Sequence, residues 1–453
     1  MKVVLLSTYD LGRQPFGLAS PAAWLRRAGA EVSCLDLAVD KLDEARVRAA
    51  DLVAFHVPMH TATRISVGVL GRVKALNPAA RLCFYGLYAP VNEVYLRGLG
   101  VHTVLGGEFE KGLVDLVGSL ENGDKTPRQE SCVSLEKLRF VVPDRRGLPD
   151  LTRYAGLDPG NGPVRTVGYT EASRGCKHLC RHCPIVPVYR GAFRVVQPDV
   201  VLEDIRRQTA AGARHVTFGD PDFFNGVGHA IRLVKAFHAE HPDLTYDVTI
   251  KVEHLLKHAA HLATLRETGC LFVTSAVESI DDRVLRIFEK GHTREDFIRV
   301  VHLFREIGLH LNPTFVTFTP WTSLEGYRAL LSSLIDLELV DRVSPVQLAI
   351  RLLIPAGSRL LELPEVEQIV DGFEEAALSY TWRNKDPRVD ELQRVVLDLV
   401  KRGEARGETR RQIFARVWRA VHGAEEMADE DVPALPILPS PAAIPFLTEP
   451  WYC

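Results

Sequence analysis

The stretch Glu171–Cys183 reads Glu-Ala-Ser-Arg-Gly-Cys-Lys-His-Leu-Cys-Arg-His-Cys and is the most informative part of this chain. It holds Cys176, Cys180 and Cys183 in a CxxxCxxC pattern, whereas the other cysteines are widely spaced. Such spacing lets one short loop place three sulfurs around a compact centre, and three thiolates leave one iron of a 4Fe-4S cluster without a protein ligand. The pattern therefore predicts that these cysteines ligate a 4Fe-4S cluster with one open iron.

Structural zinc is the main competing interpretation of three close cysteines. A tetrahedral zinc site would need a fourth Cys or a His at comparable spacing, and His178 or His182 could supply it. A disulfide between two of the three cysteines, or a spacing that arose by chance, would also be compatible with the pattern.

Length and composition indicate a globular protein of two or three domains. The 453 residues carry a formal net charge of -3 and no long basic run, which makes nucleic acid an improbable partner. Met1 leads directly into a short strand-like run without a signal-peptide core, and no apolar run approaches the roughly 20 residues of a membrane span. Widely spaced cysteines are typical of reduced thiols, so we expect a cytoplasmic protein without a membrane partner.

The first part of the chain, residues 1–120, alternates short apolar runs with helical patterns. This alternation predicts an α/β fold with βαβ units and a doubly wound, Rossmann-like parallel sheet. Turn-forming residues then predict a linker over 121–164. The expected strands of the sheet are residues 3–7, 32–35, 52–57, 82–85 and 103–105.

Six further βα units are predicted over residues 165–365, followed by a helical C-terminal region at 366–430. Residues 431–453 form a proline-rich tail that ends in Cys453. The expected strands of the second region are residues 166–170, 215–218, 246–250, 271–276, 311–318 and 346–353.

The cysteine stretch and the βα units that follow it resemble the radical S-adenosylmethionine (SAM) superfamily. The resemblance implies a partial (β/α)6 TIM barrel, a 4Fe-4S cluster whose open iron chelates SAM, and reductive cleavage of SAM to a radical. It also implies a small-molecule substrate and an external electron donor such as flavodoxin or ferredoxin. His182 stands where most members carry an aromatic residue, which is a departure that touches no ligand.

The first domain resembles the cobalamin-binding-like domains that precede many radical SAM cores. Residues 14–32 and Gly106–Glu110 carry this resemblance. No Asp-x-His-x-x-Gly motif follows any of the strands, so the axial histidine of that family has no counterpart, and His56 and His60 lie in a different context. Some relatives bind cobalamin without that histidine and others keep only the fold as a lid or scaffold, so cobalamin is a possible cofactor and both alternatives stay open.

The superfamily places its SAM contacts just after the barrel strands. Asp220 and, as second choice, Asp222 stand in place of the Gly-Gly-Glu motif that receives the amino group of SAM. A carboxylate suits this position because the ligand presents an ammonium-type donor. A turn with two Asp residues can also be only a turn.

Other stretches after strands resemble further SAM contacts. Lys251 could pair with the SAM carboxylate and Glu253 with a ribose hydroxyl. Glu278 and Ser279 lie in a stretch similar to a Gly-x-Glu-Ser motif near SAM. Arg351 could hold the SAM carboxylate or an anionic substrate, or it could form a structural salt bridge.

Residues 11–25, 57–64 and 82–90, together with the terminal Glu449–Cys453, resemble radical SAM proteins that end in a Cys-Sec-Ala-Glu-Pro or Cys-Cys-Ala-Glu-Pro tail. In that family Trp-Tyr-Cys is followed by selenocysteine or Cys, so we expect the native chain to continue beyond Cys453. The resemblance implies a catalytic role for Cys453, because a chalcogen pair at the end of the tail could hold a soft, thiophilic atom or accept the radical-derived group.

Three functions follow as alternatives. The first is reductive cleavage of SAM that starts radical chemistry on a small substrate. The second is transfer of the 3-amino-3-carboxypropyl group of SAM to a soft, arsenic- or selenium-like acceptor, suggested by a more distant similarity to the radical SAM enzyme of arsinothricin biosynthesis. The third is a non-catalytic iron-sulfur redox sensor or binding protein, which would leave the predicted SAM-contact stretches unexplained.

Overall fold

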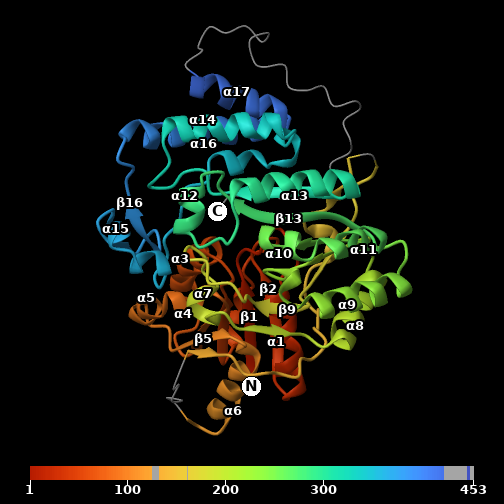
Figure 1. Cartoon of the computed structure of the whole chain (residues 1–453). Coiled ribbons are helices and arrows are strands. Elements are labelled where there is room, and N and C mark those ends of the chain that lie inside the picture. The colour runs from red at the N-terminus through yellow and green to blue at the C-terminus, as the bar shows by residue number, and fades with distance from the viewer. Residues whose placement is uncertain (125–131, 161, 423–445, 449–453) are drawn as a thin grey trace.

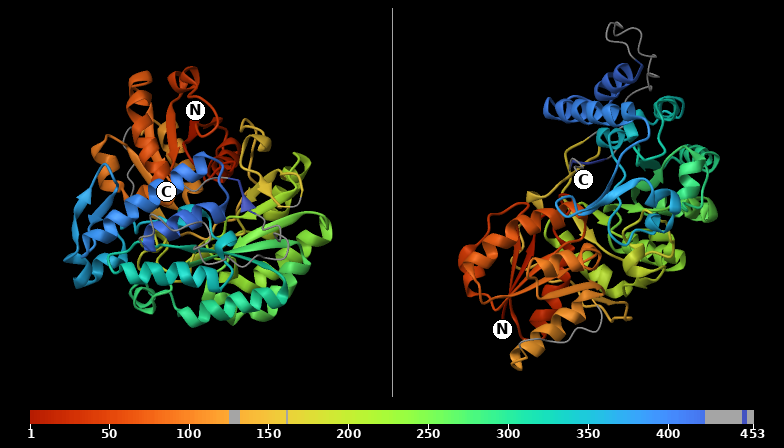
Figure 2. Two further views of the ribbon diagram at one scale, coloured as in Figure 1. Left: turned by 90° about the horizontal axis from the view of Figure 1, so that it is seen from above. Right: turned by 90° about the vertical axis from the view of Figure 1, so that its left-hand side faces the viewer.

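The computed structural model describes residues 1–124, 132–160, 162–422 and 446–448. An N-terminal α/β domain, drawn red to orange, lies at one end of the molecule in Figure 1. A second α/β unit, yellow to teal, occupies the middle, and the last helices, in blue, lie at the opposite end. Figure 2 shows the same order of parts from two further directions.

The N-terminal domain is built on a six-stranded sheet in the order β2-β1-β3-β4-β5-β6, and all its strand pairs are parallel. The five predicted strands are confirmed, and a sixth short strand comes from the predicted linker. Its strands are β1 (Lys2–Ser7), β2 (Glu31–Asp36), β3 (Leu52–His56), β4 (Arg81–Tyr85), β5 (Thr103–Gly107) and β6 (Val133–Ser134).

Helices cover both faces of this sheet, as the doubly wound pattern predicts. On one face, α1 (Phe16–Arg27) packs beside α6 (Phe109–Glu121), and Leu18, Ala22 and Leu25 of α1 are buried at helical spacing. The other face carries α2 (Glu44–Ala49), α3 (His60–Leu76), α4 (Tyr88–Val91) and α5 (Glu93–Gly98).

The middle unit contains an open five-stranded parallel sheet in the order β14-β13-β12-β11-β8. The predicted sixth strand, residues 346–353, forms instead a 3-10 turn at Pro345–Leu348 and one parallel bridge between Phe318 and Arg351. The result is a partial barrel whose helices lie outside it. The strands are β8 (Val167–Thr170), β11 (His215–Phe218), β12 (Thr245–Thr249), β13 (Cys270–Glu278) and β14 (His310–Phe315).

The helices around the barrel alternate with its strands in the chain, as βα units require. Together with the strands they bury the largest hydrophobic core among the described residues. They are α8 (Pro198–Ala210), α9 (Val227–Glu240), α10 (Val252–Lys257), α11 (Leu262–Glu267), α12 (Asp282–Ile287), α13 (Arg294–Ile307) and α14 (Leu324–Asp336).

The helical prediction for the C-terminal region is wrong for residues 370–382. A short helix, α15 (Pro364–Glu367), is followed there by an antiparallel hairpin of β15 (Val370–Glu374) and β16 (Ser379–Trp382). The rings of Phe373 and Tyr380 pair across the two strands with centroids 5.4 Å apart, a contact that stabilises a hairpin and is unavailable to a helix.

The remainder of this region is helical as predicted. The helices α16 (Pro387–Ala405) and α17 (Arg410–His422) pack on each other, and α17 also packs on α14. Residues 446–447 form β17, which pairs with β7 (Leu157–Asp158). In the described ranges, no helix has both the length and the apolar character that crossing a membrane demands.

Candidate functional site

The cysteine loop follows the first barrel strand, β8, after one short intervening strand. After β8 the chain forms β9 (Ser173–Gly175), which pairs with β10 (Phe193–Val195), and the loop runs from Cys176 to Cys183. Gly175 has a φ of +73°, and a Cβ there would lie 2.4 Å from the Tyr189 ring and 2.5 Å from the Ala192 carbonyl. Glycine is therefore required immediately before Cys176 to turn the chain into the loop.

The thiols of this loop are largely shielded from solvent. Burial raises the pKa of Cys183 to about 12 and also raises that of Cys176. A thiol in such surroundings stays protonated until a metal displaces the proton. The described residues contain one group of three His, Cys, Asp or Glu donor atoms within 4.8 Å of one another, and it contains none of these sulfurs. Sulfurs on one tetrahedral zinc would lie about 3.8 Å apart, so the loop suits a larger centre better than zinc.

Glu278 links the cysteine loop to Lys290, which follows α12. It ends β13 with a φ of +69°, a left-handed conformation that is uncommon for a residue with a side chain. Its Oε1 lies 3.1 Å from His182 Nε2 of the loop and 3.3 Å from Lys290 Nζ. Burial alone would raise the pKa of Glu278, but the charges of Lys290 and His182 lower it to about 2.

Lys290 is a functional candidate whose role sequence reasoning did not recognise. It is buried after α12, and its pKa is raised because Glu278 and the neighbouring Cys180 and Cys183 outweigh the effect of burial. A buried ammonium group beside these sulfurs favours their thiolate form. Its position in the Lys-Gly-His-Thr run after Glu278 was the available signal.

Asp220 follows β11 as predicted, but both of its carboxylate oxygens already accept hydrogen bonds from other residues. Its Oδ2 accepts a hydrogen bond from the Ala172 amide at 2.9 Å, and its Oδ1 accepts one from the Ser173 hydroxyl at 2.5 Å. Burial raises its pKa to about 7, against the effect of these hydrogen bonds. Asp220 therefore anchors the strand that leads into the cysteine loop, and its contact with SAM stays a prediction.

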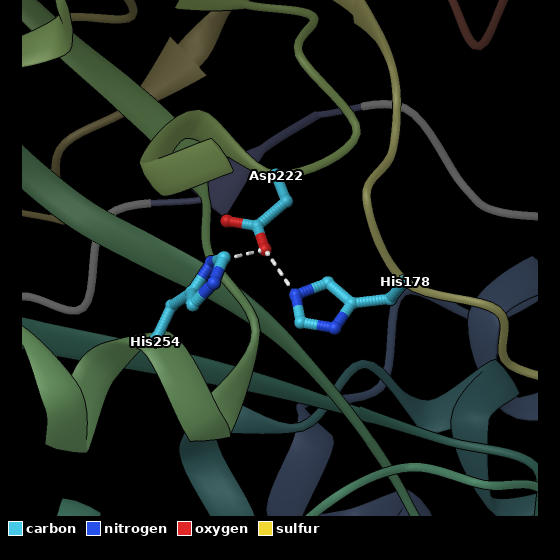
Figure 3. A group of neighbouring side chains, drawn as sticks. All are labelled: His178, Asp222 and His254. Atoms are coloured by element: carbon cyan, nitrogen blue, oxygen red, sulfur yellow. Dashed lines mark ion pairs between the residues drawn. The ribbon is translucent and has the colours of Figure 1, made fainter. Parts of the chain in front are cut away.

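Asp222 lies between His178 and His254, as Figure 3 shows. The sequence offered His178 only as a fourth ligand of a cysteine-bound zinc, and it gave His254 no role. Its Oδ2 is 2.7 Å from His254 Nδ1 and 3.5 Å from His178 Nε2. On the far side of His178, Lys251 Nζ lies 3.0 Å from His178 Nδ1 and 3.0 Å from Glu253 Oε2. The predicted residues after β11 and β12 thus meet the cysteine loop at His178.

Two other predicted residues have structural partners. The Ser279 hydroxyl accepts the Asp281 amide at 3.0 Å where the chain enters α12. Arg351 pairs with Asp390 at 2.6 Å and lies 3.6 Å from the centroid of the Trp382 ring, so it faces the C-terminal region. A SAM contact for Ser279 or Arg351 stays a prediction, and Cys453 lies outside the described residues.

A buried ion cluster joins the N-terminal domain to the cysteine loop. Arg174 of β9 binds both oxygens of Glu110 at 2.7 and 2.9 Å and reaches Glu108 at 3.2 Å. Both glutamates follow β5, and the Tyr189 hydroxyl donates to Glu108 at 3.3 Å. The carboxyl edge of the N-terminal sheet is therefore held directly against the segment that carries Cys176.

The barrel and its loop define a known class of protein. Residues 170–322 match the radical SAM superfamily, so this part of the chain is a radical SAM domain. The cofactors of that class are a 4Fe-4S cluster and SAM, which agrees with the sequence prediction.

The curated relatives that this chain matches are distant in sequence. It is 24% identical over 328 residues to a hopanoid C-3 methylase of Methylococcus capsulatus, covering 68% of this chain and 62% of that protein. It is 25% identical over 269 residues to a tRNA-2-methylthio-N(6)-dimethylallyladenosine synthase of Bacillus subtilis, covering 58% and 45%. The chain thus spans less than two thirds of either relative.

Two solved structures share the fold. One is the radical SAM methyltransferase TsrM from Kitasatospora setae with tryptophan and aza-SAM bound, with a TM-score of 0.63, 19% identity and coverage of 81% of this chain and 76% of TsrM. The other is the cobalamin-dependent radical SAM enzyme OxsB with aqua-cobalamin bound, with a TM-score of 0.66, 13% identity and coverage of 87% and 66%. Their likeness supports the two-domain α/β fold.

The carboxyl edge of the N-terminal sheet is the place to test for a cobalamin ligand. His56 ends β3, but its ring is buried against Gly17 and Gly86, and burial lowers its pKa to about 3. His60 Nε2 lies 2.5 Å from the Ala377 carbonyl of the C-terminal hairpin. Both described histidines at this edge are engaged in packing or bonding, so neither offers an open axial imidazole.

Gly17 provides a test of this packing. A Cβ at Gly17 would lie 2.1 Å from the His56 ring, so Gly17→Ala should lower the free energy of unfolding by about 1–3 kcal/mol, the usual cost of overpacking. Gly71→Ala in α3 is the matched control, because nothing lies within 4 Å of its Cβ. It should raise stability by about 0.5–1 kcal/mol. Urea unfolding measures both variants, and equal effects would contradict the packing described for His56.

Proposed function

We propose that this chain is a radical SAM enzyme that cleaves SAM reductively at a 4Fe-4S cluster held by Cys176, Cys180 and Cys183, and so starts radical chemistry on a small substrate. The observation that carries the proposal is the position of the cysteine loop. It lies at the mouth of the barrel and is bonded through His182 to Glu278, at the end of a central strand. Ligands of parallel barrels bind at this end.

The charges at the mouth suit both the cluster and SAM. Lys290 offsets the negative charge of the thiolates, since its buried ammonium group interacts with Cys180 and Cys183. Glu278 has one oxygen directed at Lys290 and His182, and as a carboxylate it can accept further hydrogen bonds. We propose that Glu278 receives an ammonium or hydroxyl donor of SAM.

The remaining predicted contacts divide into positioning and binding roles. Asp220 positions β9, and through it the loop, by its bonds to Ala172 and Ser173. Lys251 and Glu253 provide a cation and an anion at the edge of the same mouth, where they can meet the carboxylate and a ribose hydroxyl of SAM. When bound, the reduced cluster supplies the electron that splits a carbon-sulfur bond of SAM.

One assay distinguishes the proposed cleavage from the competing functions. The full-length protein is reconstituted with iron and sulfide under nitrogen, then incubated with dithionite and SAM, and the products are separated by chromatography. 5'-Deoxyadenosine supports the proposed cleavage. Methylthioadenosine would indicate aminocarboxypropyl transfer instead, S-adenosylhomocysteine would indicate methyl transfer as the names of the relatives suggest, and intact SAM would favour a sensor.

Glu278→Gln should weaken SAM binding by roughly ten- to a hundred-fold. The variant keeps the shape of the side chain but removes its charge, and a buried polar group without its partner costs about 1–3 kcal/mol, at about 1.4 kcal/mol per decade of affinity. Calorimetry on the reconstituted protein measures the dissociation constant. Glu295→Gln, an exposed carboxylate of α13, should leave it unchanged. Equal affinity of Glu278→Gln and the wild type, at equal iron content, would remove Glu278 from the SAM site.

A further inference from the structure

Three side chains from separate segments converge beside the cysteine loop (Figure 3). His178 belongs to that loop, Asp222 follows β11, and His254 lies in α10 after β12. Their donor atoms, His178 Nε2, Asp222 Oδ2 and His254 Nδ1, all lie within 4.8 Å of one another. Asp222 Oδ2 is the common neighbour, 2.7 Å from His254 and 3.5 Å from His178.

The three converging atoms share a second property, because all are buried and none makes a hydrogen bond of acceptable geometry. The Asp222 side chain is only 2% exposed and that of His254 only 9%. Buried polar atoms are nearly always satisfied, since leaving them unpaired is costly. Three unsatisfied donor atoms that face one point are what a cation site looks like before the cation is bound.

We propose that His178, Asp222 and His254 bind one divalent transition-metal ion, with Zn²⁺ as the best-fitting ion, at a site separate from the iron-sulfur cluster. Metal-nitrogen bonds of 2.0–2.1 Å in a tetrahedral site place neighbouring donors about 3.3 Å apart. The separations of 2.7 and 3.5 Å lie on either side of that value, so small side-chain movements complete the site. Two imidazoles and one carboxylate form a donor set that suits zinc and ferrous iron, and of these two zinc binds such donors more tightly.

The groups around the three ligands support this assignment. Asp222 is oriented by its other oxygen, Oδ1, which accepts the Phe224 amide at 3.1 Å. A metal on His178 Nε2 requires the proton on Nδ1, and Glu253 Oε2, 3.7 Å from Nδ1, would accept a hydrogen bond from it in place of the present 3.0 Å contact with Lys251 Nζ. A carboxylate behind a ligating imidazole is the usual arrangement in metal sites. Glu253 is thus a positioning residue of the proposed site.

The proposed ion could bind one further ligand from the substrate or solvent. Three protein ligands leave at least one coordination position open, as in catalytic zinc sites. His178 lies two residues from both Cys176 and Cys180, so the ion would lie beside the loop that is proposed to hold the cluster. An oxygen atom of the substrate, or a water molecule, is the class of ligand that the open position would take.

Zinc binding to the reconstituted full-length protein tests the inference. The 4Fe-4S protein is equilibrated anaerobically with limiting ZnCl₂ and desalted, and zinc, iron and sulfide are measured. We expect one zinc per chain, bound by nitrogen and oxygen at about 2.0–2.1 Å and without sulfur at about 2.3 Å in zinc X-ray absorption spectra. Asp222→Asn and His254→Ala should each lower zinc affinity by more than about 100-fold, because each removes a ligand and loss of an outer partner alone costs about 10–100-fold.

His258→Ala is the matched control, since His258 neighbours His254 with ring centroids 5.6 Å apart but lies outside the converging group. It should bind zinc as the wild type does. Asp222→Asn keeps the size of the side chain and covers the case in which His254→Ala fails to fold. Glu253→Gln should lower affinity by about 10–100-fold and leave the ligand spectrum unchanged.

Three results would overturn the assignment: no stoichiometric zinc, sulfur in the first shell, or equal zinc affinity of the wild type, Asp222→Asn and His254→Ala. They would show that Asp222 only forms ion pairs with the two histidines. The same samples separate this inference from the proposed function. Zinc bound without SAM cleavage would refute only the function, and SAM cleavage without zinc would refute only the metal site.

Discussion

Replacing Cys176, Cys180 or Cys183 by Ala should abolish SAM cleavage and prevent assembly of a stable 4Fe-4S cluster. In the proposed site each thiolate would hold one iron, and burial raises the pKa of Cys176 and Cys183, which makes them poor nucleophiles as free thiols. Iron and sulfide analysis after anaerobic reconstitution, the visible absorption of the cluster and chromatography of the SAM products measure the effect. Loss of turnover should be complete, since no other described group provides a thiolate triad.

Cys132→Ala is the control for this experiment, because Cys132 is half-buried in the N-terminal domain and distant in sequence from the loop. It should retain full cluster content and turnover. A triple Ala variant of the loop that keeps its iron, sulfide and activity would contradict the cluster assignment. Zinc bound tightly to the wild-type loop cysteines in place of iron would support structural zinc instead.

The strands of both sheets could be predicted because parallel strands are buried on both faces. Runs such as 52–57 and 246–250 are mostly apolar or β-branched, with one polar residue each, and they become β3 and β12. The hairpin at 370–382 could not be predicted in the same way. Its apolar residues are spaced as in an amphipathic helix, and the contact that selects the hairpin, Phe373 with Tyr380, is made only after the chain turns back.

The prediction of a sixth strand was wrong for a related reason. Residues 346–353 are mostly apolar, yet Pro345 begins a 3-10 turn, and Arg351 forms one isolated bridge to Phe318, beyond the end of β14. An apolar run predicts burial more securely than it predicts strand geometry. Most of the segment is buried as expected, and its 3-10 turn packs on α16, α17 and β14.

In the candidate site, too, contacts between residues close in sequence could be predicted, whereas contacts between residues far apart in the chain could not. The three cysteines are close together in sequence, so their spacing alone predicts a metal centre. The pairing of His178 with Asp222 and His254 joins residues far apart in the chain, and no periodicity reports it. Arg351 shows the converse, since its strand position suggested the barrel mouth while Asp390, which the chain reaches later, holds it at the C-terminal region.

Arg174→Met should be the most destabilising single change in the described part of the interface between the domains. It leaves Glu108 and Glu110 buried and without their cation, and breaking a buried ion pair in this way costs about 3–5 kcal/mol. Burial alone raises the pKa of Glu110, and Arg174 brings it below its ordinary value. A carboxyl with a lowered pKa contributes stability that is present above its unfolded-state pKa and is lost as pH falls through its folded-state pKa, so the loss in the variant should be largest at neutral pH and should shrink in acid.

Urea unfolding of the apo protein, followed by circular dichroism, measures this effect, and a double-mutant cycle with Glu110→Gln isolates the pair. Arg206→Met is the matched control, because Arg206 also binds a glutamate, Glu240, through two nitrogens, but at an exposed position. It should change stability little, since exposed ion pairs contribute little. If Arg174→Met were no more harmful than Arg206→Met, the buried cluster would not be what holds the N-terminal sheet against β9. The expected outcome is that the variant also assembles less cluster, because Arg174 lies two residues before Cys176 and fixes the strand from which the loop begins.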